Sequence, residues 1–173
     1  TFERRYGDCK DKTVLLISIL ARLGLEAHPA LVDTDMEHTI SDQLPSAKIF
    51  NHVITYLKLE NDVYWLDPTK THQYGSLKSI FPPDYGSALV LKPGSEALAS
   101  IQPIHANARI EVKDSYFLHH NNQQATRFES TTAYYGKNAE RQRKYLEQES
   151  VSGAQQNYLE FVGRYFSGAR VDQ

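Results

Sequence analysis

Residues 8–24, DCKDKTVLLISILARLG, join a helix start, a long apolar run and a helix end in one stretch. Asp8 is the expected N-cap, and Asp11 three residues later completes an approximate capping box with an acidic first turn. The run that follows is apolar nearly all round, which is typical of a central, buried helix. Gly24 is expected at the C′ position that ends it. The sequence therefore predicts a buried helix with Cys9 on its first turn.

Strands are expected directly after this helix. Residues 26–32 form the first, and the alternating stretch KIFNHVITYLKL (48–59) forms the second. A short turn at residues 60–62 leads into VYWLD (63–67), which pairs with the second strand as a hairpin. A further strand covers residues 88–91. The expected fold class is α+β, with the buried helix packed on an antiparallel sheet.

The character of the chain changes near residue 103. ARIEVKDSYFL (108–118) and ATRFESTTAYY (125–135) read as the two arms of a long hairpin around HHNNQQ (119–124). Two helical patterns follow, at about residues 138–150 and 154–166. We therefore predict two parts: residues 1–102 as a core, and residues 103–173 as a hairpin with two helices.

Composition limits the classes of function. The 173 residues are 40% hydrophobic and 23% charged, as expected of a packed soluble fold of one domain or a domain plus part of a second. A net charge of −2 without a long basic run argues against nucleic-acid binding. No apolar run approaches the roughly 20 residues of a membrane-spanning helix. One cysteine allows no internal disulfide.

The hairpin register brings a histidine near an aspartate. If the turn centres on residues 60–61, Asp67 lies opposite Ile54 and one diagonal step from His52 on the same face. The chain then supplies a helix-start cysteine, a strand histidine and a carboxylate on the neighbouring strand. A free thiol titrates at about pH 8.5, so a nucleophilic Cys9 needs a nearby histidine to take its proton. A carboxylate on the other ring nitrogen would fix the tautomer of that histidine.

Other interpretations stay open at this level. Cys9 can be an ordinary structural cysteine, His52 an ordinary strand histidine, and Asp67 a turn residue before proline. A metal site is not expected, because Cys9 and the scattered histidines show no ligand spacing; these are His28, His38, His72 and His105, with His119 and His120 in a polar turn. The acidic cluster Asp33, Asp35 and Glu37 lacks the full calcium-loop pattern and is expected to be a solvated loop.

Three further residues are candidates for a substrate cleft. Tyr56 and Trp65 lie on the two hairpin strands, although strand aromatics more often belong to a core. Asn51 precedes the histidine and can hydrogen-bond near the site, or can simply lie on the face of the sheet.

Three motifs, taken together and in this order, resemble a known family. They are YGDCKDKTVLLISILARLGLEAHPALV (6–32), FNHVITYL (50–57) and YWLDPT (64–69). They closely resemble bacterial transglutaminase-like domains of the papain-like cysteine-enzyme superfamily, in a subgroup with an N-terminal β-rich domain upstream. The resemblance covers roughly residues 3–92.

The resemblance implies a papain-like core with Cys9 as nucleophile, His52 as general base and acid, and Asp67 as orienting carboxylate. It implies a protein or peptide substrate, no cofactor, and a periplasmic or exported location. The family's core continues upstream of its cysteine, whereas eight residues precede Cys9 here. The resemblance therefore implies a core truncated at its N-terminus, whose second oxyanion donor is not visible.

The expected chemistry is acyl transfer on an amide or peptide bond through a thioester. Hydrolysis, as in a protease or amidase, is favoured slightly over transamidation to an amine. The alternative is a non-catalytic module on the same fold that binds proteins or the cell envelope.

Overall fold

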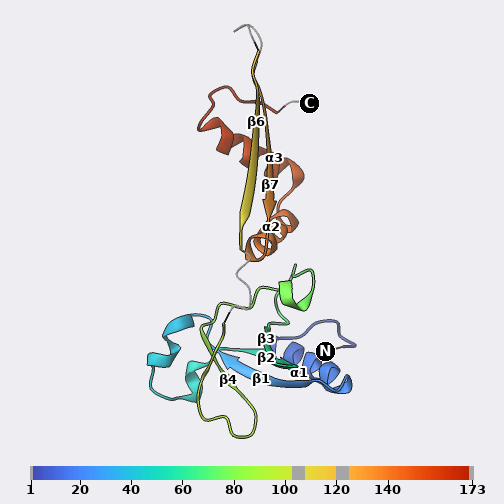
Figure 1. The fold of residues 1–173 in the computed structure, drawn as a ribbon, viewed down its shortest axis with the longest axis vertical. Helices are drawn as coiled ribbons and strands as arrows, with labels where there is room; N and C mark the ends of the chain where they lie inside the picture. The colour runs from blue at the N-terminus through green and yellow to red at the C-terminus, as the bar shows by residue number, and fades with distance from the viewer. Residues whose placement is uncertain (1, 103–107, 120–124, 172–173) are drawn as a thin grey trace. The chain divides into compact units, whose positions relative to one another are not determined.

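The computed structural model describes residues 2–102, 108–119 and 125–171. The chain divides into two compact units, residues 1–106 and 107–173. The fold is α+β: the described residues form α-helices, short 3-10 helices and antiparallel sheets (Figure 1). None of the helices that these residues form is both long enough and apolar enough to cross a bilayer.

Unit 1 is built on one antiparallel sheet with the strand order β3-β2-β1-β4-β5. Its elements, in chain order, are α1 (Cys9–Arg22), β1 (Glu26–Val32), η1 (Glu37–Asp42), η2 (Ala47–Ile49), β2 (His52–Leu59), β3 (Asp62–Leu66), η3 (Leu77–Ser79), β4 (Ser87–Val90) and β5 (Ala99–Ser100).

The strand predictions agree with this sheet except at the edges. β1 has the predicted bounds, and β2 and β3 pair through a turn that places Leu59 opposite Asp62. β2 begins at His52 rather than at residue 48, because residues 47–49 form a 3-10 turn capped by the Ser46 hydroxyl. β5 was not expected, since its two residues carry no periodicity.

The two faces of the sheet bury different clusters. One face carries the larger core, whose buried members are Ala30, Val32, Ile54, Tyr56, Trp65, Tyr85, Ala88, Val90 and Ile101. On the other face α1 packs across β1 and β2 (Figure 1), where Leu20, Leu57 and Tyr64 are buried together. Because successive side chains of β2 point to opposite faces, this strand contributes residues to both clusters.

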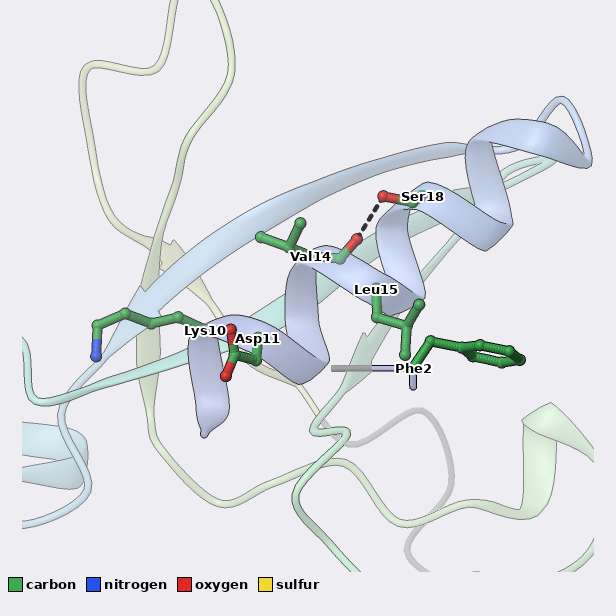
Figure 2. A pocket seen from close by; sticks show the side chains of 6 residues that line it. All are labelled: Phe2, Lys10, Asp11, Val14, Leu15 and Ser18. Atoms are coloured by element: carbon green, nitrogen blue, oxygen red, sulfur yellow. Dashed lines mark hydrogen bonds between the residues drawn. The ribbon is translucent and has the colours of Figure 1, made fainter. Parts of the chain in front are cut away.

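The expectation that α1 is buried on all sides is wrong. Its buried residues are Thr13 and Leu20, whereas Val14 is 60% and Leu23 is 69% exposed. Only one side of the helix lies on the sheet, so its apolar outer side faces solvent. Figure 2 shows this outer side, where Val14, Leu15 and Ser18 lie with Phe2 along a shallow hollow, and the Ser18 hydroxyl donates to the Val14 carbonyl at 2.7 Å.

Unit 2 contains the predicted hairpin and helices: β6 (Ile110–Phe117), β7 (Arg127–Tyr134), α2 (Lys137–Gln148) and α3 (Val151–Gly163). The hairpin pairs from Ile110 opposite Tyr134 to Phe117 opposite Arg127. Tyr116, Phe128 and Phe166 form a ring cluster with centroids 5.0–6.2 Å apart. His119 is exposed, and His120 and His105 lie outside the described residues.

Candidate active site

Cys9 is the first residue of α1 and is half-buried. The predicted capping box is present: the Asp11 N–H donates to Asp8 Oδ1 at 3.0 Å, and the Asp8 N–H donates to Asp11 Oδ2 at 3.3 Å. The Asp11 N–H, followed by the charge of Lys10, lowers the pKa of Asp8. The cap therefore holds the first turn, and with it the thiol, in a defined position.

His52 and Asp67 form the predicted pair. His52 Nε2 lies 3.0 Å from Asp67 Oδ2, and the two side chains are 13% and 1% exposed. The observed pairing of Thr55 with Leu66 puts Asp67 one residue further, opposite Ile54, as the register prediction requires. Because Asp67 engages Nε2, the remaining nitrogen, Nδ1, is the one that can exchange a proton with a thiol.

Asp67 accepts four hydrogen bonds. Besides His52, the Thr69 hydroxyl donates to Oδ1 at 2.6 Å, the Thr69 N–H donates to Oδ1 at 2.9 Å, and the Tyr85 hydroxyl donates to Oδ2 at 2.9 Å. Burial by itself would raise the pKa of Asp67, but the bonds from Thr69, His52 and Tyr85 outweigh it and lower that pKa. The Asp67 carboxylate is therefore held ionised.

Tyr85 and Thr69 are site residues that the sequence reasoning missed. Tyr85 is only 8% exposed in the core, and its ring and that of His52 form a T-shaped pair with centroids 5.8 Å apart. The Asp-Pro-Thr motif is a signal for Thr69, since an aspartate commonly accepts from a residue two positions on. Tyr85 stands in a turn-rich segment 18 residues from Asp67, and no local pattern points to it.

A buried hydrogen bond joins the helix of Cys9 to the strand of His52. The Thr13 hydroxyl, one turn after Cys9, donates to the Val53 carbonyl at 3.1 Å. Cys9 and His52 consequently line one groove of about 330 Å³. Within the part of the chain that the structure describes, Cys9 Sγ makes no hydrogen bond.

The predicted cleft residues separate into two groups. Asn51 lines the groove, and its amide binds the loop after β1: Oδ1 accepts from the Thr34 N–H at 2.9 Å, and Nδ2 donates to Asp35 Oδ2 at 3.1 Å. Tyr56 and Trp65 instead pack edge to face in the core, 5.4 Å between centroids. Their alternate positions along the strands place both side chains on the face of the sheet that carries the larger core. Tyr56 and Trp65 are therefore core residues and do not line this groove.

Some acidic and histidine side chains elsewhere have local partners. Asp33 Oδ1 accepts from the N–H groups of Asp35 and Met36, and the exposed His38 Nε2 lies 3.1 Å from Asp84 Oδ1. Across residues 2–102, 108–119 and 125–171, no three histidine, cysteine or acidic side chains gather as a metal site would require.

Comparison with known proteins gives no relative: no family model, no curated protein and no solved structure matches the chain.

Proposed function

We propose that unit 1 is a transglutaminase-like domain that performs cysteine-dependent acyl transfer on an amide or peptide bond. The observation that carries the proposal is the buried His52–Asp67 pair, 3.0 Å apart, in the same groove as the helix-start thiol of Cys9. The residues of the Gly-Asp-Cys, His-Val and Asp-Pro-Thr motifs, and their order along the chain, support the proposal further.

The proposed reaction has two halves. In the first, His52 Nδ1 takes the thiol proton, Cys9 Sγ forms a bond to the amide carbonyl carbon, and the C–N bond breaks as the imidazolium protonates the leaving amine. In the second, His52 takes a proton from the acceptor, whose oxygen or nitrogen bonds to the thioester carbon. The C–S bond then breaks and the thiolate recovers its proton.

Two neighbouring groups assist these steps. Asp67 holds the imidazole in one orientation and stabilises its charged form, since its own pKa is lowered. The N–H of Cys9, as the first residue of α1, lies outside the hydrogen-bond ladder of the helix and can donate to the oxyanion. A water acceptor makes the enzyme a protease or amidase, and an amine makes it a transglutaminase. Hydrolysis is favoured because Cys9 is only half-buried and water reaches the thioester.

The first test is the rate at which iodoacetamide alkylates Cys9 between pH 6 and pH 8.5. His52→Ala is expected to lower the rate constant at pH 6.5 by about 10-fold or more, because the imidazole no longer takes the thiol proton. His38→Ala is the matched control, since it removes a histidine from an exposed histidine–aspartate pair. It is expected to leave the rate unchanged. Equal rates in all three proteins would contradict catalysis and favour the non-catalytic binding module.

The acceptor is identified by mass spectrometry. A glutamine-containing peptide is incubated with the protein and a primary amine. A deamidated or cleaved peptide indicates hydrolysis, and an amine adduct indicates transamidation. Cys9→Ala is expected to abolish either product, whereas products that persist in this variant would sink the proposed mechanism.

A further inference from the structure

Beside the proposed catalytic pair, the groove continues over an apolar wall. This wall is formed by Val14 from α1, Pro29 and Leu31 from β1, Phe50 just before β2, Val53 in β2, and Leu91 just after β4. Pro29 and Leu31 alternate along β1 with the buried Ala30 and Val32, so they face the side of the sheet that α1 covers. The Leu91 N–H donates to the Pro29 carbonyl at 2.8 Å, which fixes one end of the wall.

The polar side chains of the groove are mostly committed to the protein itself. Thr13 donates its hydroxyl to the Val53 carbonyl, and Asn51 uses its amide on the Thr34 N–H and the Asp35 carboxylate. Lys10 is 77% exposed with its ammonium 3.7 Å from Asp8. No carboxylate lines the groove among the described residues. Apart from Cys9 and His52, the groove therefore offers a ligand mainly apolar contacts.

We propose that this groove binds an apolar side chain of the acyl donor, next to the carbonyl that Cys9 attacks. An apolar side chain removes its surface and that of Leu31, Phe50 and Leu91 from water. An acidic side chain would lose its hydration there, and the Lys10 ammonium, which lines the groove, offsets little of that loss because it is 77% exposed and 3.7 Å from Asp8. The volume of about 330 Å³ is at the small end of the ligand-site range, so it holds one or two side chains and not a long peptide.

This inference rests on the proposed function, and one experiment separates the two. Two chloroacetamides are reacted with Cys9, one carrying an isobutyl group and one carrying a carboxymethyl group. Each rate constant is divided by that of the same reagent with glutathione, which removes intrinsic reactivity. The wild-type protein is expected to prefer the isobutyl reagent by about 10-fold, the discrimination typical of a small apolar pocket.

Leu91→Asp is the diagnostic variant, because Leu91 is 46% exposed and its replacement leaves the core intact. It is expected to reduce the isobutyl preference to near one. Leu44→Asp is the matched control: Leu44 is 87% exposed and outside the groove, and the preference should stay. A wild-type preference of one, or a preference untouched by Leu91→Asp, overturns the apolar pocket.

His52→Ala provides the separate reading of the proposed function. It is expected to slow the reaction of both reagents, while the protein still prefers the isobutyl reagent. Loss of the His52 effect with the preference retained would remove the acyl-transfer proposal while the apolar groove stands as a binding site. A His52 effect without a preference would do the opposite.

Discussion

At the scale of single residues, Asp67 has the clearest physical role. Its side chain is 1% exposed, and four donated hydrogen bonds stabilise the charged form of its carboxylate. Folding lowers its pKa, so the native state gains stability at every pH at which the carboxylate is ionised. This gain is complete above the ordinary aspartate value of 3.8 and is lost as the pH falls below it toward the folded value.

Asp67→Asn is therefore expected to destabilise unit 1 by about 2 kcal/mol at pH 7, in the range of hydrogen bonds to a charged group. The difference from wild type should shrink as the pH falls below 3.8. Urea unfolding followed by the fluorescence of Trp65, the only tryptophan and a core residue, measures it in this unit. The exposed Asp42→Asn is the control. A difference that stays constant from pH 7 to pH 3 would contradict the assignment.

Tyr85 is expected to act through Asp67 rather than on substrate. Tyr85→Phe keeps the ring against His52 and removes only the hydroxyl that donates to Asp67 at 2.9 Å. The loss of unfolding free energy should be about 1–2 kcal/mol. In a double-mutant cycle, the loss in the double variant with Asp67→Asn should differ from the sum of the two single losses by at least ~0.5 kcal/mol. Iodoacetamide alkylation of Cys9 should also slow at pH 6.5. Additive losses, or an effect matched by the exposed Tyr6→Phe, would argue against this role.

At the scale of elements, the contact between α1 and β2 decides whether thiol and imidazole share one groove. The buried Thr13 hydroxyl makes this connection with the Val53 carbonyl. Thr13→Val keeps the shape of the side chain and leaves that carbonyl without this donor. We expect a loss of about 1–3 kcal/mol in unfolding free energy and a smaller His52-dependent part of Cys9 alkylation. Thr13→Ser retains the hydroxyl and should keep most of the unfolding free energy and most of the His52-dependent alkylation. If Thr13→Ser instead behaves like Thr13→Val, the hydrogen bond to the Val53 carbonyl does not cause these losses.

The strands and helix ends were predictable because each rests on local chemistry. The cap of α1 follows from Asp8, and the bounds of β1 follow from period-2 alternation. The β2–β3 register follows from a two-residue turn, in which Glu60 has a φ of 57°. The proximity of His52 to Asp67 followed from that register alone.

The rest depends on contacts distant in sequence. An all-round apolar pattern could not reveal that only one side of α1 has a sheet to pack on. The hydrogen bond from Tyr85 to Asp67 joins residues 18 positions apart within the core. Whether Tyr56 and Trp65 are buried depends on which face of the sheet carries the larger cluster. None of these leaves a local sequence pattern, so the sequence left open whether Tyr56 and Trp65 lie in the core or line a cleft.

At the scale of the whole molecule, the two units differ in how much they bury. Unit 1 contains two clusters of large buried side chains, whereas the buried hydrophobic residues of unit 2, among those described, are Ala139 and Ala154. Local stability follows buried apolar contact. We expect amide hydrogens of β1 and β2 to exchange far more slowly than those of β6 and β7. Hydrogen exchange read by mass spectrometry on peptides of the intact chain measures this, and equal protection in both sheets would contradict it.

The order of the site residues along the chain has a consequence for biosynthesis. Cys9, Thr13, His52, Asp67 and Tyr85 all precede residue 107, where the second unit begins. Domains fold as units, the N-terminal one first, while translation continues. The ribosome therefore delivers every group of the proposed site before the hairpin and helices of unit 2 exist. A nascent chain arrested after unit 1 is then the earliest form of the protein in which the thiol and its imidazole can meet.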